Sequence, residues 1–123
     1  MSQWRILSVE DDPDGQELVS TILTHMNIPM DVAYNAEQAE ELLFQQGHLY
    51  NAIVVDLALP GKDGWALLRQ IRADARTRHI PCIAVTAYHT SKLREDALRG
   101  GFNAYFSKPL DAMSFGRQIQ SMM

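Results

Sequence analysis

Cysteine is nearly absent from this sequence of 123 residues, and long apolar runs are absent altogether. Cys82 stands alone in the run IPCIAV, which excludes an internal disulfide and a site made of several thiolates, and predicts a buried side chain. No stretch approaches the roughly 18 apolar residues of a membrane span. The N-terminal MSQWRILSVEDD reaches acidic residues before the core of a signal peptide could form. We therefore expect a cytoplasmic protein without a membrane segment.

Basic residues are also few, with 11 Lys and Arg against 15 Asp and Glu and a formal net charge of -4. No basic stripe with interleaved aromatic residues is present, so direct binding to nucleic acid is not expected. The 46% hydrophobic and 21% charged residues are typical of a globular chain rather than a disordered one. A chain of this length buries roughly 68% of its unfolded surface. Residues 1–123 are therefore expected to form one domain.

Short runs rich in Val and Ile alternate with segments of helical periodicity. This alternation is typical of a parallel sheet with helices on both faces, which is the α/β class. The predicted strands are 4–9, 30–34, 52–56, 80–86 and 104–107.

Helix signals fill the segments between these runs. Asp12 before Pro13 predicts a helix start, and this first helix should end near 25–27. Its expected inward residues are Leu18, Ile22 and Met26, with Val19 and Leu23 beside them. Asn35 with Gln38 resembles the capping box of a second helix that carries Ala39, Leu42 and Leu43 inward and ends at Gly47.

Three further helices are predicted after the loop PGKDG. The third covers about 63–73, the fourth about 91–99, and the fifth starts near 111. The expected inward residues are Leu67, Leu68 and Ile71 of the third, Leu93, Ala97 and Leu98 of the fourth, and Phe115, Ile119 and Met122 of the fifth. The apolar stripe of the fourth helix is thin, which predicts an element that moves or docks a partner.

Reactive or polar side chains follow four of the predicted strands. They are Glu10, Asp11 and Asp12 after the first, Asp56 at the end of the third, Thr86 at the end of the fourth and Lys108 after the fifth. In a doubly wound sheet the carboxyl ends of the strands meet at one edge, where ligands bind. Gathered carboxylates repel by ~4 kcal/mol per close pair at an effective dielectric near 20, so they need a cation. An oxygen-only set favours Mg²⁺ over zinc.

These residue types together predict phosphoryl transfer. Asp56 can attack phosphorus, while Mg²⁺ and Lys108 neutralise the developing charge. The Thr86 hydroxyl can add a hydrogen bond, and the new negative charge should draw it inward. Asp12 is mainly expected to cap the first helix, with its charge helping to hold the ion.

The motifs ILSVEDD, VVDLALPGKDG, AVTA and YFSKP resemble, in order and spacing, the four signatures of response-regulator receiver domains of two-component signalling, the chemotaxis regulators among them. The resemblance covers essentially the whole chain. It implies a flavodoxin-like (βα)5 sandwich of three layers with the parallel sheet order 2-1-3-4-5. It also implies a switch that assists its own phosphorylation and dephosphorylation rather than an enzyme.

By this resemblance Asp56 is the phosphoacceptor, and Glu10 and Asp11 are the acidic pair, Asp11 as a direct ligand of Mg²⁺ and Glu10 acting through water. Mn²⁺ is the expected substitute metal. Ala58 matches the position whose backbone carbonyl binds the metal. Thr86 matches the switch hydroxyl, Lys108 the phosphate-binding lysine and Tyr105 the aromatic residue that turns inward. A cis peptide is implied before Pro109.

The resemblance also implies partners. A histidine kinase or a histidine phosphotransfer domain should donate the phosphoryl group. A downstream protein or an attached output domain should read the surface formed by the fourth helix, fifth strand and fifth helix, which is also a candidate dimer interface.

Two features depart from the commonest pattern of the family. Glu10 replaces the usual first aspartate, which keeps the charge and lengthens the side chain. Ala58 and Tyr88 occupy positions that modulate attack of water on the acyl phosphate. We expect a long-lived phosphoryl state, because Tyr88 could shield it and Ala58 cannot orient water.

Two other functions are compatible with parts of the pattern. A phosphatase of the haloacid dehalogenase type needs a second acid two residues after its nucleophilic aspartate, where this chain has Ala58. A receiver-like scaffold that is never phosphorylated would lack the acidic pair, the threonine or the lysine, and none is missing. The histidines show no ligand spacing and are expected at or near the surface, while Trp4 and Trp65 are expected to pack.

Overall fold

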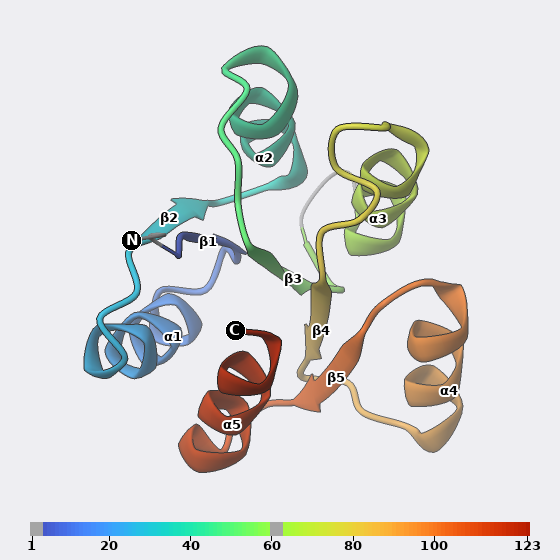
Figure 1. The fold of residues 1–123 in the computed structure, drawn as a ribbon. Helices are drawn as coiled ribbons and strands as arrows, with labels where there is room; N and C mark the ends of the chain where they lie inside the picture. The colour runs from blue at the N-terminus through green and yellow to red at the C-terminus, as the bar shows by residue number, and fades with distance from the viewer. Residues whose placement is uncertain (1–3, 60–62) are drawn as a thin grey trace.

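The computed structural model describes residues 4–59 and 63–123, and most of the loop PGKDG lies outside them. Its centre is a parallel sheet whose strand order is β2-β1-β3-β4-β5, which confirms the predicted topology (Figure 1). The strands are β1 (Ile6–Val9), β2 (Met30–Ala33), β3 (Ala52–Asp56), β4 (Cys82–Thr86) and β5 (Ala104–Ser107). Because β1 pairs with both β2 and β3, the chain reverses its direction of winding beside β1.

Helices cover both faces of the sheet (Figure 1). One face carries α1 (Pro13–His25) and α5 (Ala112–Met122), and the other carries α2 (Ala36–Glu40) with the π-helical turn η1 (Glu41–Gln45), α3 (Gly64–Ala73) and α4 (Ser91–Gly100). Side chains alternate along each strand, so Ile6 packs toward α1 and α5 while Leu7 packs toward the other helices. Each fully buried Leu, Ile or Phe of these two cores contributes roughly 1.5–3 kcal/mol.

Helix caps lie where the sequence predicts them. The Asp12 side chain accepts from the backbone N–H of Asp14 at the start of α1, and the Asn35 side chain accepts from that of Gln38 at the start of α2. The Gln38 side chain accepts in turn from the N–H of Tyr34, which fixes the entry into α2.

Three predicted strands are shorter in the structure. Ile80 is buried at 2% exposure, yet its N–H donates to Thr77 in a turn rather than to a neighbouring strand. Pro81 has no N–H to donate, so β4 begins after it. Tyr34 is 54% exposed and its N–H is taken by Gln38, which ends β2 early. Residues 4 and 5 precede β1 for a similar reason, because the N–H of Arg5 donates to the Asn51 side chain.

Some predicted core positions are less buried than expected. The buried face of α1 is formed by Val19, Ile22 and Leu23, whereas Leu18 and Met26 are only partly buried at its margin. Leu98 of α4 is 39% exposed, and Ala97 is the buried residue of that helix. The other expected inward residues of α3 and α5 are buried, except Met122, which is partly buried. Cys82 is fully buried as predicted.

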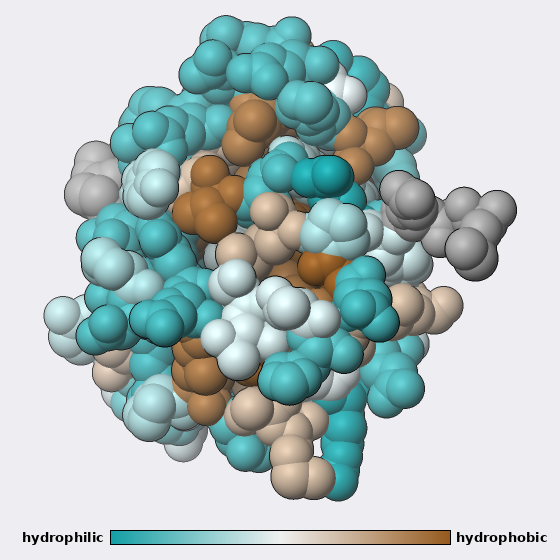
Figure 2. Space-filling model, turned by 90° about the vertical axis from the view of Figure 1, so that its left-hand side faces the viewer, coloured by the Kyte–Doolittle hydropathy of each residue, from teal (hydrophilic) through white to brown (hydrophobic). Residues whose placement is uncertain are grey.

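Strand β2 forms one edge of the sheet, on the face that Figure 2 shows. Hydrophilic side chains dominate this face, and apolar atoms gather in separate patches among them (Figure 2). Asp31 of β2 lies 2.6 Å from the Arg5 guanidinium and accepts from the Tyr50 hydroxyl at 2.7 Å. Charged side chains on an edge strand discourage pairing with another chain. Among residues 4–59 and 63–123, no helix has the length and apolar character needed to cross a bilayer.

Candidate functional site

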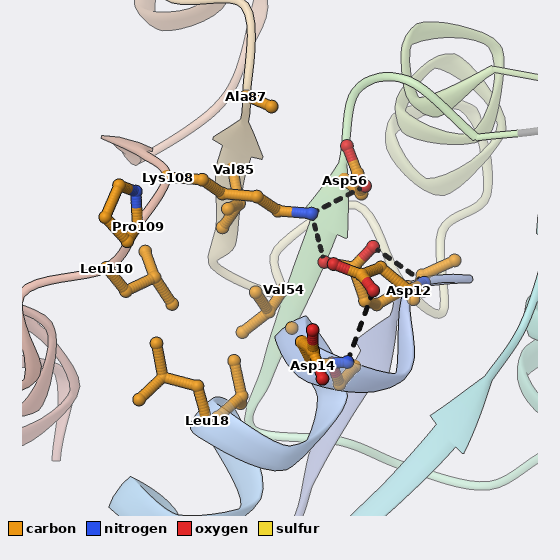
Figure 3. Close-up of a pocket in the computed structure, with 15 residues that line it drawn as sticks. Asp12, Asp14, Leu18, Val54, Asp56, Val85, Ala87, Lys108, Pro109 and Leu110 are labelled. Carbon is orange, nitrogen blue, oxygen red and sulfur yellow. Dashed lines mark hydrogen bonds and ion pairs between the residues drawn. The ribbon is translucent and has the colours of Figure 1, made fainter.

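Four neighbouring strands have their carboxyl ends side by side. Asp56 is the last residue of β3 and Thr86 the last of β4, while Glu10 directly follows β1 and Lys108 directly follows β5. Side-chain alternation turns Glu10 and Asp56 toward α1, and Lys108 reaches the same place from β5 (Figure 3). The predicted meeting of Glu10, Asp56 and Lys108 at the carboxyl ends of the strands therefore occurs in the structure.

Three carboxylates form a compact cluster there. Glu10, Asp11 and Asp56 each have an oxygen within 4.8 Å of the others. Glu10 and Asp56 are each 6% exposed, whereas Asp11 is exposed. Three negative groups this close repel one another unless a cation lies among them. Carboxylate oxygens in this number and spacing fit a hard divalent ion such as Mg²⁺.

Lys108 supplies a positive charge to this cluster. Its Nζ lies 2.6 Å from Oε1 of Glu10 and 3.1 Å from Oδ2 of Asp56 (Figure 3). Burial and the neighbouring Asp56 carboxylate raise the pKa of Glu10 to about 7, although Lys108 opposes the shift. Burial would raise the pKa of Asp56, but its bonds to Glu10, the Ala58 N–H and Lys108 outweigh burial and lower it. The aspartate is therefore held as the anion, which is the form that can attack phosphorus.

Backbone groups fix both buried carboxylates. The N–H of Ala58 donates to Oδ1 of Asp56 at 3.0 Å. The N–H of Asp12 donates to Oε2 of Glu10 at 3.3 Å, and the Gln16 side chain donates to the Glu10 carbonyl at 2.5 Å. The start of α1 is thereby tied to the acidic loop, and Asp12 acts as the N-cap that the sequence predicts.

The hydroxyl of Thr86 lies at the next strand end. Thr86 is 1% exposed, and its Oγ1 accepts from the N–H of Tyr88 at 3.1 Å. The Tyr88 side chain is 73% exposed and does not line the cavity beside Asp56, whereas Ala87 does. The shielding expected of Tyr88 concerns the acyl phosphate and stays a prediction, and in the unphosphorylated structure this side chain faces solvent.

Tyr105 of β5 is packed rather than free. It is 9% exposed, belongs to the core on the side of α3 and α4, and its hydroxyl lies 3.0 Å from Nδ1 of His89. His89 lies near the surface as expected, but its contact with Tyr105 was missed at the level of sequence. One feature could have indicated this contact: His89 lies in the loop after β4, and β4 pairs with β5, the strand that carries Tyr105. The peptide between Lys108 and Pro109 is cis, as expected.

Comparison with known proteins decides the family. The family model of the response regulator receiver domain matches residues 6–120. The chain is a response-regulator receiver domain. It therefore belongs to two-component signalling, where this domain occurs both in response regulators and within histidine kinases.

Three relatives illustrate this membership. An uncharacterized 14.6 kDa protein of Leptolyngbya boryana is 38% identical over 98% of this receiver and 90% of its own length. Response regulator Rre1 of Synechocystis sp. is 33% identical over 86% of this receiver, which spans only 46% of that relative. The solved receiver domain of sensor histidine kinase PA1611 from Pseudomonas aeruginosa is 31% identical, with a TM-score of 0.86 and 98% of each chain covered. In that structure a magnesium ion is coordinated in the active-site cleft.

A cavity of about 380 Å³ opens beside the acidic cluster of the receiver. Apolar side chains from α1, β3, β4 and the segment before α5 line most of it (Figure 3), and Glu10, Asp56 and Lys108 line it as well. Gly15 of α1 also lines it, close to Glu10. Nothing in the sequence singles out Gly15, because a glycine within a predicted helix has no side chain that could bind or react.

Proposed function

We propose that this receiver accepts a phosphoryl group on Asp56 in a Mg²⁺-dependent reaction and thereby switches a protein-binding surface. The observation that carries the proposal is the position of the Asp56 carboxylate, which is nearly buried within a cluster of two further carboxylates and 3.1 Å from the Lys108 ammonium. A buried carboxylate with one neighbouring cation and a site for a second suits the transfer of a highly charged group.

The donor atoms fit the metal. Glu10, Asp11, Asp56 and the backbone carbonyl of Ala58 are the proposed ligands, with Glu10 acting through water and Mn²⁺ as a substitute ion. Bound there, the ion would neutralise charge on the transferred phosphoryl group.

The reaction uses few protein groups. A carboxylate oxygen of Asp56 attacks the phosphorus of a phosphohistidine on a histidine kinase or a histidine phosphotransfer domain, the P–N bond breaks, and the imidazole leaves with the electron pair. Lys108 then has phosphoryl oxygens to pair with in place of the Asp56 carboxylate. Attack of water on the acyl phosphate later releases inorganic phosphate and restores the aspartate. The domain thus assists its own phosphorylation and dephosphorylation.

Thr86 and Tyr105 are the proposed route to the surface. The Thr86 oxygen accepts from Tyr88, so its proton remains available to donate to a phosphoryl oxygen. Movement of this hydroxyl toward Asp56 vacates space beside β5, and Tyr105 follows it after releasing His89. The surface of α4, β5 and α5 would then present a different shape to a downstream protein, an attached output domain or a second copy.

We propose that this exchange takes place in the cytoplasm, with residues 1–123 acting as one receiver domain. The single cysteine is free and buried, which is compatible with a reducing compartment.

Intact mass spectrometry with phosphoramidate and Mg²⁺ tests the proposal. The parent should gain one phosphoryl group, and chelation of the metal should prevent the gain. Asp56→Asn should gain none, because an amide is not a nucleophile for phosphorus, whereas the exposed control Asp63→Asn should behave as the parent. Absence of the added group in the parent would refute the phosphoacceptor role.

The switch is tested separately with beryllofluoride, a mimic of the phosphoryl group. Thr86→Ala should still take up phosphoryl groups, but its NMR shifts in α4 and β5 should respond less than those of the parent. A full response in Thr86→Ala would contradict the proposed route.

A further inference from the structure

Gly15, in the first turn of α1, lies against the end of the Glu10 side chain. A Cβ placed on Gly15 would stand 2.5 Å from Oε1 of Glu10 and 3.0 Å from its Cδ. The first separation is shorter than real Cβ contacts, and the second is tighter than most of them, so the Glu10 side chain would have to shift. The Glu10 carboxylate therefore occupies space that exists only because residue 15 has no side chain.

The helix is not free to withdraw and make this space another way. The Gln16 side chain donates to the Glu10 carbonyl, and the Gln16 N–H donates to the Asp12 carbonyl at 3.0 Å. The Asp14 N–H donates to the Asp12 side chain at 3.2 Å. These bonds hold the first turn of α1 to the acidic loop, so a methyl group at residue 15 displaces the flexible end of Glu10 instead.

Displacement of that end would break the contacts that place the carboxylate. Oε1 of Glu10 would leave the Lys108 ammonium, now at 2.6 Å, and Oε2 would leave the Asp12 N–H. The arrangement in which Glu10, Asp11 and Asp56 each have an oxygen within 4.8 Å of the others would be lost as well.

We propose that Gly15 is a positioning residue for the acidic cluster, because it provides the slot that glutamate at position 10 requires. The closest atom, Oε1, lies one bond farther along the side chain than any atom of aspartate, whose Oδ atoms reach only about as far as Cδ, so the requirement should be strongest for glutamate. Residues 10 and 15 are thus a matched pair. The metal-binding part of this inference rests on the proposed Mg²⁺ site.

A double-mutant cycle tests the pairing. The parent, Gly15→Ala, Glu10→Asp and the double variant are compared by urea unfolding in EDTA and by the Kd for Mg²⁺ from backbone NMR shifts. Gly116→Ala in α5 is the matched control, since a Cβ there meets nothing closer than Ile22 Cγ2 at 3.9 Å. Alanine is the better helix former, so helix propensity alone would make both glycine substitutions stabilising.

Gly15→Ala should weaken Mg²⁺ binding about fivefold or more when residue 10 is glutamate, and less than about twofold when it is aspartate. In EDTA the same substitution should stabilise the Glu10→Asp variant more than the parent, while Gly116→Ala leaves Mg²⁺ binding unchanged. The conservative change at residue 10 thus rescues the change at residue 15.

Equal effects of Gly15→Ala in the two backgrounds, in a parent that binds Mg²⁺, would overturn the pairing. A parent that fails to bind Mg²⁺ would refute the proposed metal site instead. In that case the unfolding measurements in EDTA still decide whether residues 10 and 15 are coupled.

Discussion

Replacement of Lys108 by methionine tests how far its ammonium holds the site together. The substitution keeps an unbranched side chain of similar length and removes the charge 2.6 Å from Glu10 and 3.1 Å from Asp56. Two carboxylates that are 7% exposed as side chains would then face each other without a cation. The metal-free protein should lose stability.

The magnitude lies between two limits. Breaking a fully buried ion pair costs about 3–5 kcal/mol, whereas exposed pairs contribute about 0–1 kcal/mol. The Lys108 side chain is 19% exposed, so solvent screens part of its charge. We expect Lys108→Met to lower the free energy of unfolding by about 2–3 kcal/mol at about pH 8.

The loss should shrink as the solution is acidified. In the parent, Lys108 helps to hold the pKa of Asp56 below its ordinary value and opposes the rise of the Glu10 pKa. Without Lys108 both pKa values rise, so the folded variant takes up protons before the unfolded chain does. Proton uptake relieves the repulsion, and parent and variant should therefore differ less at about pH 5 than at about pH 8.

Urea denaturation in EDTA at both pH values measures these differences. Lys92→Met is the matched control, because the Lys92 side chain is 83% exposed and lies 3.4 Å from Asp96 on the surface of α4. Its substitution should cost less than about 1 kcal/mol. A loss in Lys108→Met no greater than in Lys92→Met, or one that does not depend on pH, would refute the reasoning.

Three further expectations concern single groups. Because burial raises the pKa of Glu10 from 4.5 to about 7, the metal-free protein should lose stability as the pH rises through that interval. Glu10→Gln should flatten this decline in urea denaturation, and an unchanged slope would contradict the assignment. Mg²⁺ at a hundred times its Kd should stabilise the parent by about 2.7 kcal/mol, and Asp11→Asn should reduce the accompanying rise in Tm at the same concentration. His89→Ala releases the Tyr105 hydroxyl, so NMR shifts of β5 should move toward those of the beryllofluoride-bound parent, and unmoved shifts would exclude a restraining role for His89.

The positions of most strands and helices could be predicted because they depend on local patterns, whereas the order of the strands was implied by the resemblance to receiver domains. Asp12 and Asn35 cap their helices through residues two or three positions away, so their effect is visible in a short window of sequence. The first residue of β4 was misjudged because Ile80 is apolar and buried, yet its N–H bonds within a turn. Burial is visible in the sequence as hydrophobicity, whereas the partner of a backbone N–H is decided by the fold.

The candidate site likewise contains some residues that could be predicted from the sequence and others that could not. Glu10, Asp56 and Lys108 could be predicted to meet because each stands at the end of a strand, and the ends of parallel strands converge. The roles of Gly15 and His89 could not be predicted, because each acts through contact with a residue on another element. Such contacts depend on how closely a helix or loop packs against the sheet. A single sequence shows no pattern from which the distance between the two elements could be predicted.

The place of Lys108 directly after β5 has a mechanical consequence. In the described sheet β1 and β3 each have a neighbour on both sides, whereas β5 is an edge strand held only by β4. A pull on the Lys108 ammonium from the middle of the sheet therefore acts on a strand that has a neighbour on one side only. A change of charge at Asp56, in the middle of the sheet, can in this way displace Lys108 and with it the end of β5 at the sheet's edge. This end lies near α4, the helix in which Ala97 is the buried residue.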